Sequence, residues 1–229
     1  MEKTNQSQCI IFFVKAPVYG TVKTRMAEHT GAHGALMLYK AFAADTLATL
    51  KRMDLPLRIF YQPAGHAELV RGWLGNSTPL IAQKGATLGE RMHYALCSCT
   101  AEGFDSIILV GSDIPDLNEN IINQAFLTLQ TRQAVIGPAA DGGYYLIGAR
   151  KTGITSKAFE GIDWGSPEVF EKTLQRLREN GIEPGIITEL RDIDTGRDLQ
   201  ALAEDICARA DTAARMKHTR EVLENLKII

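Results

Sequence analysis

The chain has 229 residues, of which 45% are hydrophobic and 23% are charged, with a formal net charge of −2. This composition is typical of a globular protein with a sizeable core, and it argues against an intrinsically disordered chain. So small a net charge supplies no broad positive field, so we expect neither nucleic acid nor a membrane surface as a partner. The four cysteines form no C-x-x-C pair, the first residues are polar, and no apolar run approaches the ~20 residues of a membrane span. We therefore expect a cytoplasmic protein with reduced thiols and no membrane span.

Strands and helices alternate along the sequence. Apolar runs predict strands at 9–14, 57–61, 79–83, 106–110, 134–137, 144–147 and 185–190. Apolar residues at helical spacing predict helices at 32–52, 66–74, 87–100, 117–132 and 167–180, and then two helical stretches split near Asp211. This alternation predicts an α/β fold whose mostly parallel sheet is covered by helices on both faces. The exception is the short connection between 134–137 and 144–147, which predicts a hairpin-like pair.

No repeat, low-complexity segment or long linker interrupts this pattern, so we expect one domain spanning residues 1–229. In open α/β sheets, ligands bind outside the carboxyl ends of the strands. The residues that follow each predicted strand are therefore the candidates for a functional site.

The loop after the first strand is rich in cations. It reads Lys15-Ala16-Pro17-Val18-Tyr19-Gly20-Thr21-Val22-Lys23-Thr24-Arg25, with no acidic residue. A strand-to-helix loop directs backbone N–H groups at one spot, and Lys and Arg add positive charge, so the loop is typical of a phosphate site. Its spacing matches neither a Walker A loop nor a G-x-G-x-x-G fingerprint. From residue types alone, a solvated basic loop is the alternative.

A carboxylate follows the fully apolar strand at 106–110. Asp113 lies just past this strand, two residues before Pro115, and is placed to hold a hard cation such as Mg²⁺. The alternative is that Asp113 caps the following turn. For Asp116 we favour a structural role, and we expect either Asp116 or Asn118 to cap the next helix.

Two further carboxylates follow the last predicted strand. Asp192 and Asp194 point the same way if this segment is extended, so both are candidate metal ligands. The alternative is a helix start in which Thr195 and Asp198 form a capping arrangement. For Asp198 we favour the cap.

Glycine-containing segments follow other strands. Asp141-Gly142 is a turn signal between two apolar runs, although the glycines also suit a close backbone approach to a ligand. The segment Thr87-Leu88-Gly89-Glu90 fits a capping box, and its glycine also leaves room for a nucleobase on the backbone. Trp164 either stacks on an acceptor or fills the core. The histidines do not cluster and no serine lies in a G-x-S-x-G elbow, so Ser/His and Cys/His nucleophilic catalysis are unsupported.

Six segments in order carry a resemblance that spans about residues 9 to 202. They are KAPVYGTVKTR, LGERM, VGSDIPDL, GPAADGGYYLIG, GIDWGS and RDIDTGRDL. Together they resemble an uncharacterised bacterial family of the glycosyltransferase-A (GT-A) superfamily, labelled transferase 1 and associated with radical-SAM or selenium-related gene clusters. That family is similar to the 2-phospholactate and molybdenum-cofactor guanylyltransferases, and more distantly to nucleotide-diphospho-sugar transferases.

The resemblance implies a three-layer α/β/α, Rossmann-like GT-A fold, with about seven strands of which one is antiparallel. It also implies roles for individual residues. The implied nucleotide-binding residues are Lys15, Ala16, Pro17, Gly20, Lys23, Arg25, Leu88, Gly89 and Glu90, with the last three near the base. The implied metal ligands are Asp113, Asp192 and Asp194, and the implied acceptor side comprises Asp141, Gly142, Tyr144 and Trp164. The implied catalytic residues are Lys23, Arg25, Asp113 and Asp141.

The motifs indicate the superfamily more clearly than they indicate the reaction. Glycosyltransferases commonly have an Asp-x-Asp metal motif after the central strand, whereas this chain has Ser112-Asp113-Ile114-Pro115, which looks more like the Asp-x-Pro of nucleotidyltransferases. We expect a transferase that depends on Mg²⁺ or Mn²⁺ and acts on a nucleotide or nucleotide-diphospho-sugar with a small-molecule acceptor. Three cations in the first loop slightly favour nucleotidyl transfer, and the alternative is a catalytically inactive nucleotide-binding module. The sequence leaves the oligomeric state open.

Overall fold

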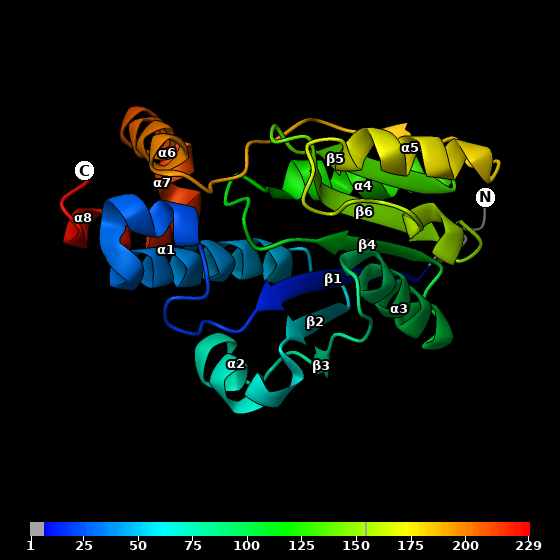
Figure 1. Ribbon diagram of the computed structural model, residues 1–229, viewed down its shortest axis with the longest axis horizontal. Helices are drawn as coiled ribbons and strands as arrows, with labels where there is room; N and C mark the ends of the chain where they lie inside the picture. The colour runs from blue at the N-terminus through cyan, green and yellow to red at the C-terminus, as the bar shows by residue number, and fades with distance from the viewer. Residues whose placement is uncertain (1–6, 154) are drawn as a thin grey trace.

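The computed structural model describes residues 7–153 and 155–229. Its described residues form a seven-stranded sheet in the order β3-β2-β1-β4-β6-β5-β7 (Figure 1). The strands are β1 (Gln8–Lys15), β2 (Leu57–Gln62), β3 (Leu80–Ala82), β4 (Ser106–Val110), β5 (Ala134–Pro138), β6 (Tyr144–Arg150) and β7 (Gly185–Ile186). Strand β6 runs antiparallel to both of its neighbours, β4 and β5, and the other described pairings are parallel. The predicted sheet, with one antiparallel strand, is confirmed.

Helices cover both faces of this sheet. They are α1 (Thr24–Arg52), α2 (Ala67–Leu74), α3 (Leu88–Ala101), α4 (Glu119–Thr131), α5 (Val169–Glu179), α6 (Gly196–Ala208), α7 (Ala210–Arg215) and α8 (Lys217–Asn225), with short 3-10 turns at Ala64–His66 and Ser156–Phe159. One apolar cluster joins the sheet to α1, α2 and α4, and a second joins the opposite face to α3 and α5. The result is the three-layer arrangement that an alternating α/β sequence predicts.

Strand β1 shows why its sequence is apolar throughout. Ile10, Phe12 and Val14 belong to the cluster on one face of the sheet, whereas Ile11 and Phe13 belong to the cluster on the other. Successive side chains of a strand point to opposite faces, so a strand covered on both faces must be apolar at every position. Burial at roughly 25 cal/mol per Å² of apolar surface makes this strand a main source of stability.

A helical lobe extends beyond the carboxyl ends of the strands. The first half of α1 packs there against α6 and α8 in a third apolar cluster, as the left side of Figure 1 shows. Helix α1 begins at Thr24 rather than at the predicted residue 32, and Gly31 (φ 70°, ψ 162°) kinks it. The extra turns pack through buried Met26, which an apolar-periodicity pattern does not single out.

The C-terminal part differs from the prediction in two respects. Strand β7 is only Gly185–Ile186 instead of 185–190. The chain beyond it still contacts the end of β5, since Leu190 N donates to Pro138 O at 3.1 Å. Three helices, rather than two, follow β7, since the chain turns at Met216, whose side chain is buried in the helical lobe.

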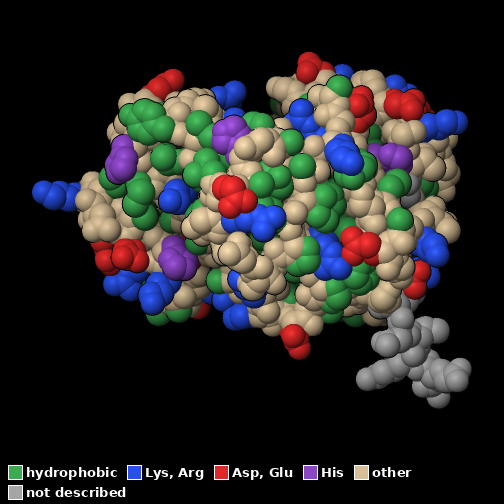
Figure 2. All heavy atoms as spheres, turned by 90° about the horizontal axis from the view of Figure 1, so that it is seen from below, with side chains coloured by type: hydrophobic (Ala, Val, Ile, Leu, Met, Phe, Trp, Pro, Cys, Tyr) green, Lys and Arg blue, Asp and Glu red, His purple; other side chains and the backbone are tan. Residues whose placement is uncertain are grey.

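The charged side chains on the face drawn in Figure 2 agree with the small net charge of the sequence. On the face in Figure 2, basic and acidic side chains are interspersed. None of the helices among residues 7–153 and 155–229 is both long and apolar enough to cross a membrane.

Candidate active site

A cleft of about 660 Å³ opens at the carboxyl ends of the parallel strands. Its lining includes predicted site residues from six separate segments of the sequence. They are Lys15, Lys23, Arg25, Leu88, Asp113, Asp141, Tyr144, Trp164, Asp192 and Asp194. The parallel sheet brings them together, because it places the ends of β1, β2 and β4 along one edge.

The first loop carries its cations toward this cleft through an unusual backbone. Lys23 is the N-cap of α1 and adopts the left-handed conformation (φ 48°, ψ 47°), which costs a non-glycine residue about 1–2 kcal/mol. The Lys23 side chain is only 5% exposed. Lys15 Nζ instead donates to the carbonyl of Thr21 at 2.6 Å, which folds the loop back on itself. Backbone strain of this kind clusters at active sites and ligand clamps, so it makes Lys23 a candidate functional residue.

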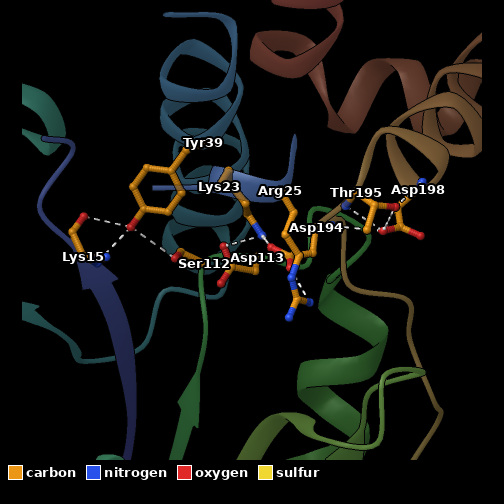
Figure 3. Close-up of polar contacts among 9 residues, drawn as sticks. All are labelled: Lys15, Lys23, Arg25, Tyr39, Ser112, Asp113, Asp194, Thr195 and Asp198. Carbon is orange, nitrogen blue, oxygen red and sulfur yellow. Dashed lines mark hydrogen bonds and ion pairs between the residues drawn. The ribbon is translucent and has the colours of Figure 1, made fainter. Parts of the chain in front are cut away.

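The cations and carboxylates of the cleft form a chain of ion pairs (Figure 3). Lys23 Nζ lies 2.9 Å from Asp113 Oδ1 and 3.5 Å from Asp194 Oδ1. Arg25 Nη1 lies 3.3 Å from Asp194 Oδ2. The basic loop is therefore not simply solvated, since two of its three cations pair with carboxylates at other strand ends.

A buried tyrosine ties two of these strand ends together. The Tyr39 hydroxyl accepts from Lys15 N and donates to Lys15 O, both at 2.8 Å, and it accepts from Ser112 Oγ at 3.4 Å. Burial, with the charge of Asp113 nearby, raises the pKa of Tyr39 above its usual value, so the phenol stays protonated. Tyr39 thus fixes the end of β1 relative to the Ser112-Asp113 segment after β4, as Figure 3 shows. Sequence reasoning missed this residue because it lies in the middle of a helix.

The segment after β7 lies beside Asp113. Ile193 N donates to Asp113 O at 3.2 Å, and the fully buried Ile193 side chain packs into the helical lobe. Asp192 and Asp194 flank Ile193, and both line the cleft, as the extended-segment prediction required.

The capping arrangement predicted as the alternative for this segment is also present, at the start of α6. Thr195 and Asp198 form a complete capping box at the start of α6, with Asp198 Oδ2 accepting from Thr195 N at 2.8 Å. The structure thus gives Asp198 the structural role and leaves Asp192 and Asp194 free to face the cleft.

Asp192 and Asp141 face the same part of the cleft. Burial raises the pKa of Asp192, and the negative charge of Asp141 raises it further. Asp141 Oδ1 accepts from Gly143 N at 2.8 Å, which holds this carboxylate in a turn. The negative charge of Asp141 beside Asp192 makes this part of the cleft a place where a cation would be stabilised.

Some of the residues predicted for the acceptor side line the cleft, and others only support the backbone around it. Tyr144 and Trp164 both line the cleft and meet edge to face, with ring centroids 6.4 Å apart. Gly142 (φ 91°) is not among the lining residues. A Cβ there would lie 2.0 Å from Pro167 O, so it is the close approach of these two backbones that requires a glycine.

Of the three residues expected near the base, only one lines the cleft, and the other two have structural roles. Leu88 lines the cleft and is 40% exposed. Gly89 is buried instead, where a Cβ would lie 2.5 Å from the Trp164 ring. Thr87 Oγ1 accepts from Glu90 N, and Glu90 Oε2 accepts from Ala86 N, so Glu90 secures the start of α3.

Three predicted first-loop residues, Ala16, Pro17 and Gly20, are likewise not among the lining residues. Ala16 is fully buried and Gly20 supplies a positive φ of 73°. These residues shape the loop. Conversely, Gln62 and Gln83 line the cleft without having been predicted. Each directly follows or ends a predicted strand, which is the signal that identifies them.

The described residues do not form a metal centre from protein side chains alone. No group of three or more His, Cys, Asp or Glu side chains in residues 7–153 and 155–229 is arranged to hold an ion. Mg²⁺ commonly uses only one or two carboxylates together with substrate phosphates and waters. Asp113 with Asp192 or Asp194 fits that kind of site, since they line one cleft next to phosphate-type cations.

Comparison with known proteins places the chain in a family. The family described as "Uncharacterized protein conserved in bacteria (DUF2064)" matches residues 46–166, which include the Asp113 and Asp141 segments. A crystal structure of a candidate nucleotide-diphospho-sugar transferase from Desulfovibrio desulfuricans G20 is 38% identical, covers 96% of this chain and 98% of its own, and superposes with a TM-score of 0.86. The chain belongs to the DUF2064 family.

More distant structures share the fold. One is 4-diphosphocytidyl-2C-methyl-D-erythritol synthase from Anaerococcus prevotii DSM 20548, with 11% identity, 89% of this chain and 100% of that chain covered, and a TM-score of 0.59. Another is Rv0371c from Mycobacterium tuberculosis H37Rv in complex with manganese, with 13% identity, 86% and 98% coverage, and a TM-score of 0.53. No curated protein matches the sequence closely enough to count as a relative. The expected association of the family with radical-SAM or selenium-related gene clusters stays a prediction.

Proposed function

We propose that this DUF2064 protein is a divalent-metal-dependent transferase that binds a nucleotide in its strand-end cleft and transfers a nucleotidyl group to a small acceptor. The transferase class is supported by the 38%-identical relative, named as a candidate nucleotide-diphospho-sugar transferase. The observation that carries the proposal is the convergence of Lys23, Arg25, Asp113 and Asp194 in one chain of ion pairs. Phosphate-type cations and metal-type carboxylates meet there on different strand ends.

The charge balance of the cleft explains why a metal is needed. Its charged lining includes three cations, Lys15, Lys23 and Arg25, and four carboxylates, Asp113, Asp141, Asp192 and Asp194. A polyphosphate that enters without a metal ion would be repelled by these negatively charged carboxylates. A polyphosphate that enters with Mg²⁺ supplies positive charge to Asp113 and negative charge to Lys23 at the same time.

In the proposed reaction, an oxygen of the acceptor forms a bond to the α-phosphorus of a nucleoside triphosphate. The bond from that phosphorus to the bridging oxygen breaks, and pyrophosphate leaves with its electrons. Lys23 and Arg25 neutralise charge on the phosphate oxygens, and Asp141 is positioned to take the proton of the acceptor. A bound Mg²⁺ or Mn²⁺, held by Asp113 with Asp192 or Asp194, would polarise the phosphoryl oxygens. No protein nucleophile is required, because positioning and charge neutralisation lower the barrier.

A second candidate, glycosyl transfer, is favoured by the name of the Desulfovibrio relative. The same cations and carboxylates would then hold the leaving nucleoside diphosphate, and Asp141 would serve as the base for the acceptor hydroxyl. Both reactions use the same cleft but differ in the bond that breaks. In glycosyl transfer the acceptor oxygen would bond to the anomeric carbon of the sugar, the bond from that carbon to the diphosphate oxygen would break, and the nucleoside diphosphate would leave in place of pyrophosphate.

The released product distinguishes them. The protein is incubated with Mg²⁺, the four nucleoside triphosphates or a panel of sugar nucleotides, and a library of phosphorylated, carboxylated and hydroxylated acceptors. Nucleotidyl transfer releases pyrophosphate, whereas glycosyl transfer releases nucleoside diphosphate. Asp113→Asn should abolish either product. Asp54→Asn, at an exposed position just after the C-terminal end of α1, serves as the matched control.

A catalytically inactive nucleotide-binding module would behave differently. It would bind a nucleotide yet release neither product with any acceptor. Asp113→Ala would then leave nucleotide affinity unchanged with and without Mg²⁺.

A further inference from the structure

The polar residues at the strand ends change from charged to neutral along the sheet edge. Asp113 follows β4, Lys15 ends β1, Gln62 ends β2 and Gln83 follows β3. Lys15 and Gln62 are direct partners in the parallel β1–β2 pairing, and Gln83 N donates to Tyr61 O at 2.9 Å. All four line the cleft. The ion-paired centre therefore adjoins an uncharged end on the side of β2 and β3, where the side chains that line the cleft carry no charge.

The orientation of the Gln62 amide at this end is determined by its neighbour. The Arg91 guanidinium donates from Nη1 to Gln62 Oε1, and since Arg has only donors, the oxygen must face it. Arg91 is itself held in place, because Nε donates to Gly85 O at 3.0 Å and Nη2 to Ala86 O at 3.3 Å. The Gln62 amide is thus pre-oriented before any ligand binds.

This orientation leaves a donor unused. Gln62 Nε2 has no hydrogen-bond partner among the described residues, and it is not one of their fully buried unpaired atoms. Gln83 differs, since its Nε2 donates to Phe60 O at 3.0 Å and to Val14 O at 3.5 Å, and its Oε1 is closed off from solvent. Gln62 therefore supplies the accessible donor at the uncharged end of the cleft.

We infer that Gln62 reads the nucleobase of the substrate, by donating from Nε2 to a carbonyl oxygen or ring nitrogen on the edge of the base. The inference rests on the proposed function, because it takes the phosphates to lie at Lys23 and Arg25. A base is the uncharged, planar part of a nucleotide, and its edge carries acceptors that suit an amide donor. The exposed, apolar Leu88 side chain lines the same cleft and offers a surface on which the flat face of the base can pack.

The Arg91 contact makes a sharp substitution available. In Gln62→Glu, one carboxylate oxygen keeps Arg91 as a partner, and the other replaces the Nε2 donor with an acceptor. Gln62→Met removes the donor without adding charge. Gln130→Glu, at an exposed position of α4, is the matched control for the same chemical change.

The experiment measures the dissociation constants of the four nucleoside triphosphates and of inorganic tripolyphosphate, each with Mg²⁺, by calorimetry. The unsubstituted chain should prefer some bases over others. Both Gln62 variants should bind the preferred nucleotide at least ~10-fold more weakly, a typical cost of losing a buried hydrogen bond. Gln62→Glu should also change the order of preference toward bases that present an amino group. Tripolyphosphate has no base, so its affinity for the unsubstituted chain, the two Gln62 variants and the Gln130→Glu control should agree within about two-fold. A difference of that size is comparable to the usual deviation from additivity between independent sites.

Two results with the variants would overturn the inference while leaving the proposed function intact. One is nucleotide binding that both Gln62 variants retain within two-fold, and the other is an equal loss for nucleotides and tripolyphosphate. If the unsubstituted chain binds tripolyphosphate but shows no preference for any nucleotide, Gln62 is not a base-reading residue. If it binds no nucleotide at all, the proposed function and this inference fail together.

Discussion

Lys23 Nζ and Asp113 Oδ1 lie 2.9 Å apart, so the two residues proposed to hold a phosphate and a metal neutralise each other in the protein alone. The lysine side chain is 5% exposed and the carboxylate is 52% exposed. A metal–nucleotide complex can replace this ion pair by giving each partner an opposite charge of its own. The arrangement thus holds a buried cation in position without leaving it uncompensated.

This relationship predicts opposite effects for the two partners when metal is absent. Lys23→Met should weaken nucleotide binding by about 10- to 100-fold, since a charge-assisted contact to phosphate contributes roughly 1.5–3 kcal/mol. Asp113→Asn should instead preserve or strengthen binding in EDTA, because it removes a negative charge beside the phosphates and frees Lys23. Calorimetric titration in EDTA measures both, with Lys51→Met at the far end of α1 as the control. Equal losses in both variants would contradict the prediction.

Tyr39→Phe should weaken both folding and function. The hydroxyl makes two 2.8 Å hydrogen bonds with the Lys15 backbone, and the loss leaves a buried N–H without its partner, at a cost of about 1–3 kcal/mol. For a chain of this size, that cost lowers Tm by roughly 2–4 °C per kcal/mol. Loss of the link to Ser112 should also reduce kcat while leaving KM nearly unchanged.

Tyr61→Phe is the matched control for Tyr39→Phe. It removes a single 3.1 Å bond to Ala64 O away from the ion-paired centre. It should lower Tm but not kcat. If both variants lose only stability, Tyr39 has no positioning role.

Asp116→Asn should stabilise the protein at neutral pH. Burial raises the pKa of Asp116, and the charge of Arg215 only partly offsets this rise. The folded state therefore holds its proton more tightly than the unfolded state, so stability falls as pH rises from the ordinary carboxyl pKa through the raised value. The asparagine variant avoids that loss. Its Tm should exceed that of the unsubstituted chain at pH 7 and match it in acid below the ordinary carboxyl pKa, whereas a lower Tm at pH 7 would contradict this assignment.

Gly142→Ala should be far more damaging than Gly65→Ala. The added methyl group at Gly142 meets Pro167 O and sits at a positive φ, whereas at Gly65 it meets open space. The clash and the strained backbone together should cost about 2–4 kcal/mol, and Gly65→Ala should change stability by less than about 0.5 kcal/mol. Chemical denaturation of both variants measures the difference, and equal stabilities would show that the turn holding Asp141 relaxes freely.

The sheet was predictable because its strands are buried on both faces. The run at 9–14 is apolar at every position and the run at 106–110 at every position after Ser106, and each became a central strand. Less regular segments were not predictable to the same degree. The first turns of α1 depend on the packing of Met26, and the break before α8 depends on the burial of Met216. Both are tertiary contacts that leave no periodic pattern.

The charged half of the candidate site was also readable from sequence. Lys23, Asp113, Asp192 and Asp194 stand out as charged residues in the segments that follow predicted strands, and all four line the cleft. Gln62 escaped notice because a neutral amide at a strand end is ordinary, and its role depends on the register of β1 with β2 and on Arg91. Gly89 shows the opposite case, since its place in a glycine-containing helix start suggested a base contact where packing against Trp164 requires the glycine.

The Mg²⁺ dependence of nucleotide binding tests the central claim most directly. Calorimetry compares the affinity of the unsubstituted protein and of Asp113→Asn for nucleoside triphosphates and sugar nucleotides, in Mg²⁺ and in EDTA. The account predicts that at least one nucleotide binds the unsubstituted protein at least ~10-fold more tightly in Mg²⁺, a coupling of about 1.4 kcal/mol, and that Asp113→Asn removes this difference. Equal affinities in Mg²⁺ and EDTA, or a Mg²⁺ effect that survives Asp113→Asn, would contradict it.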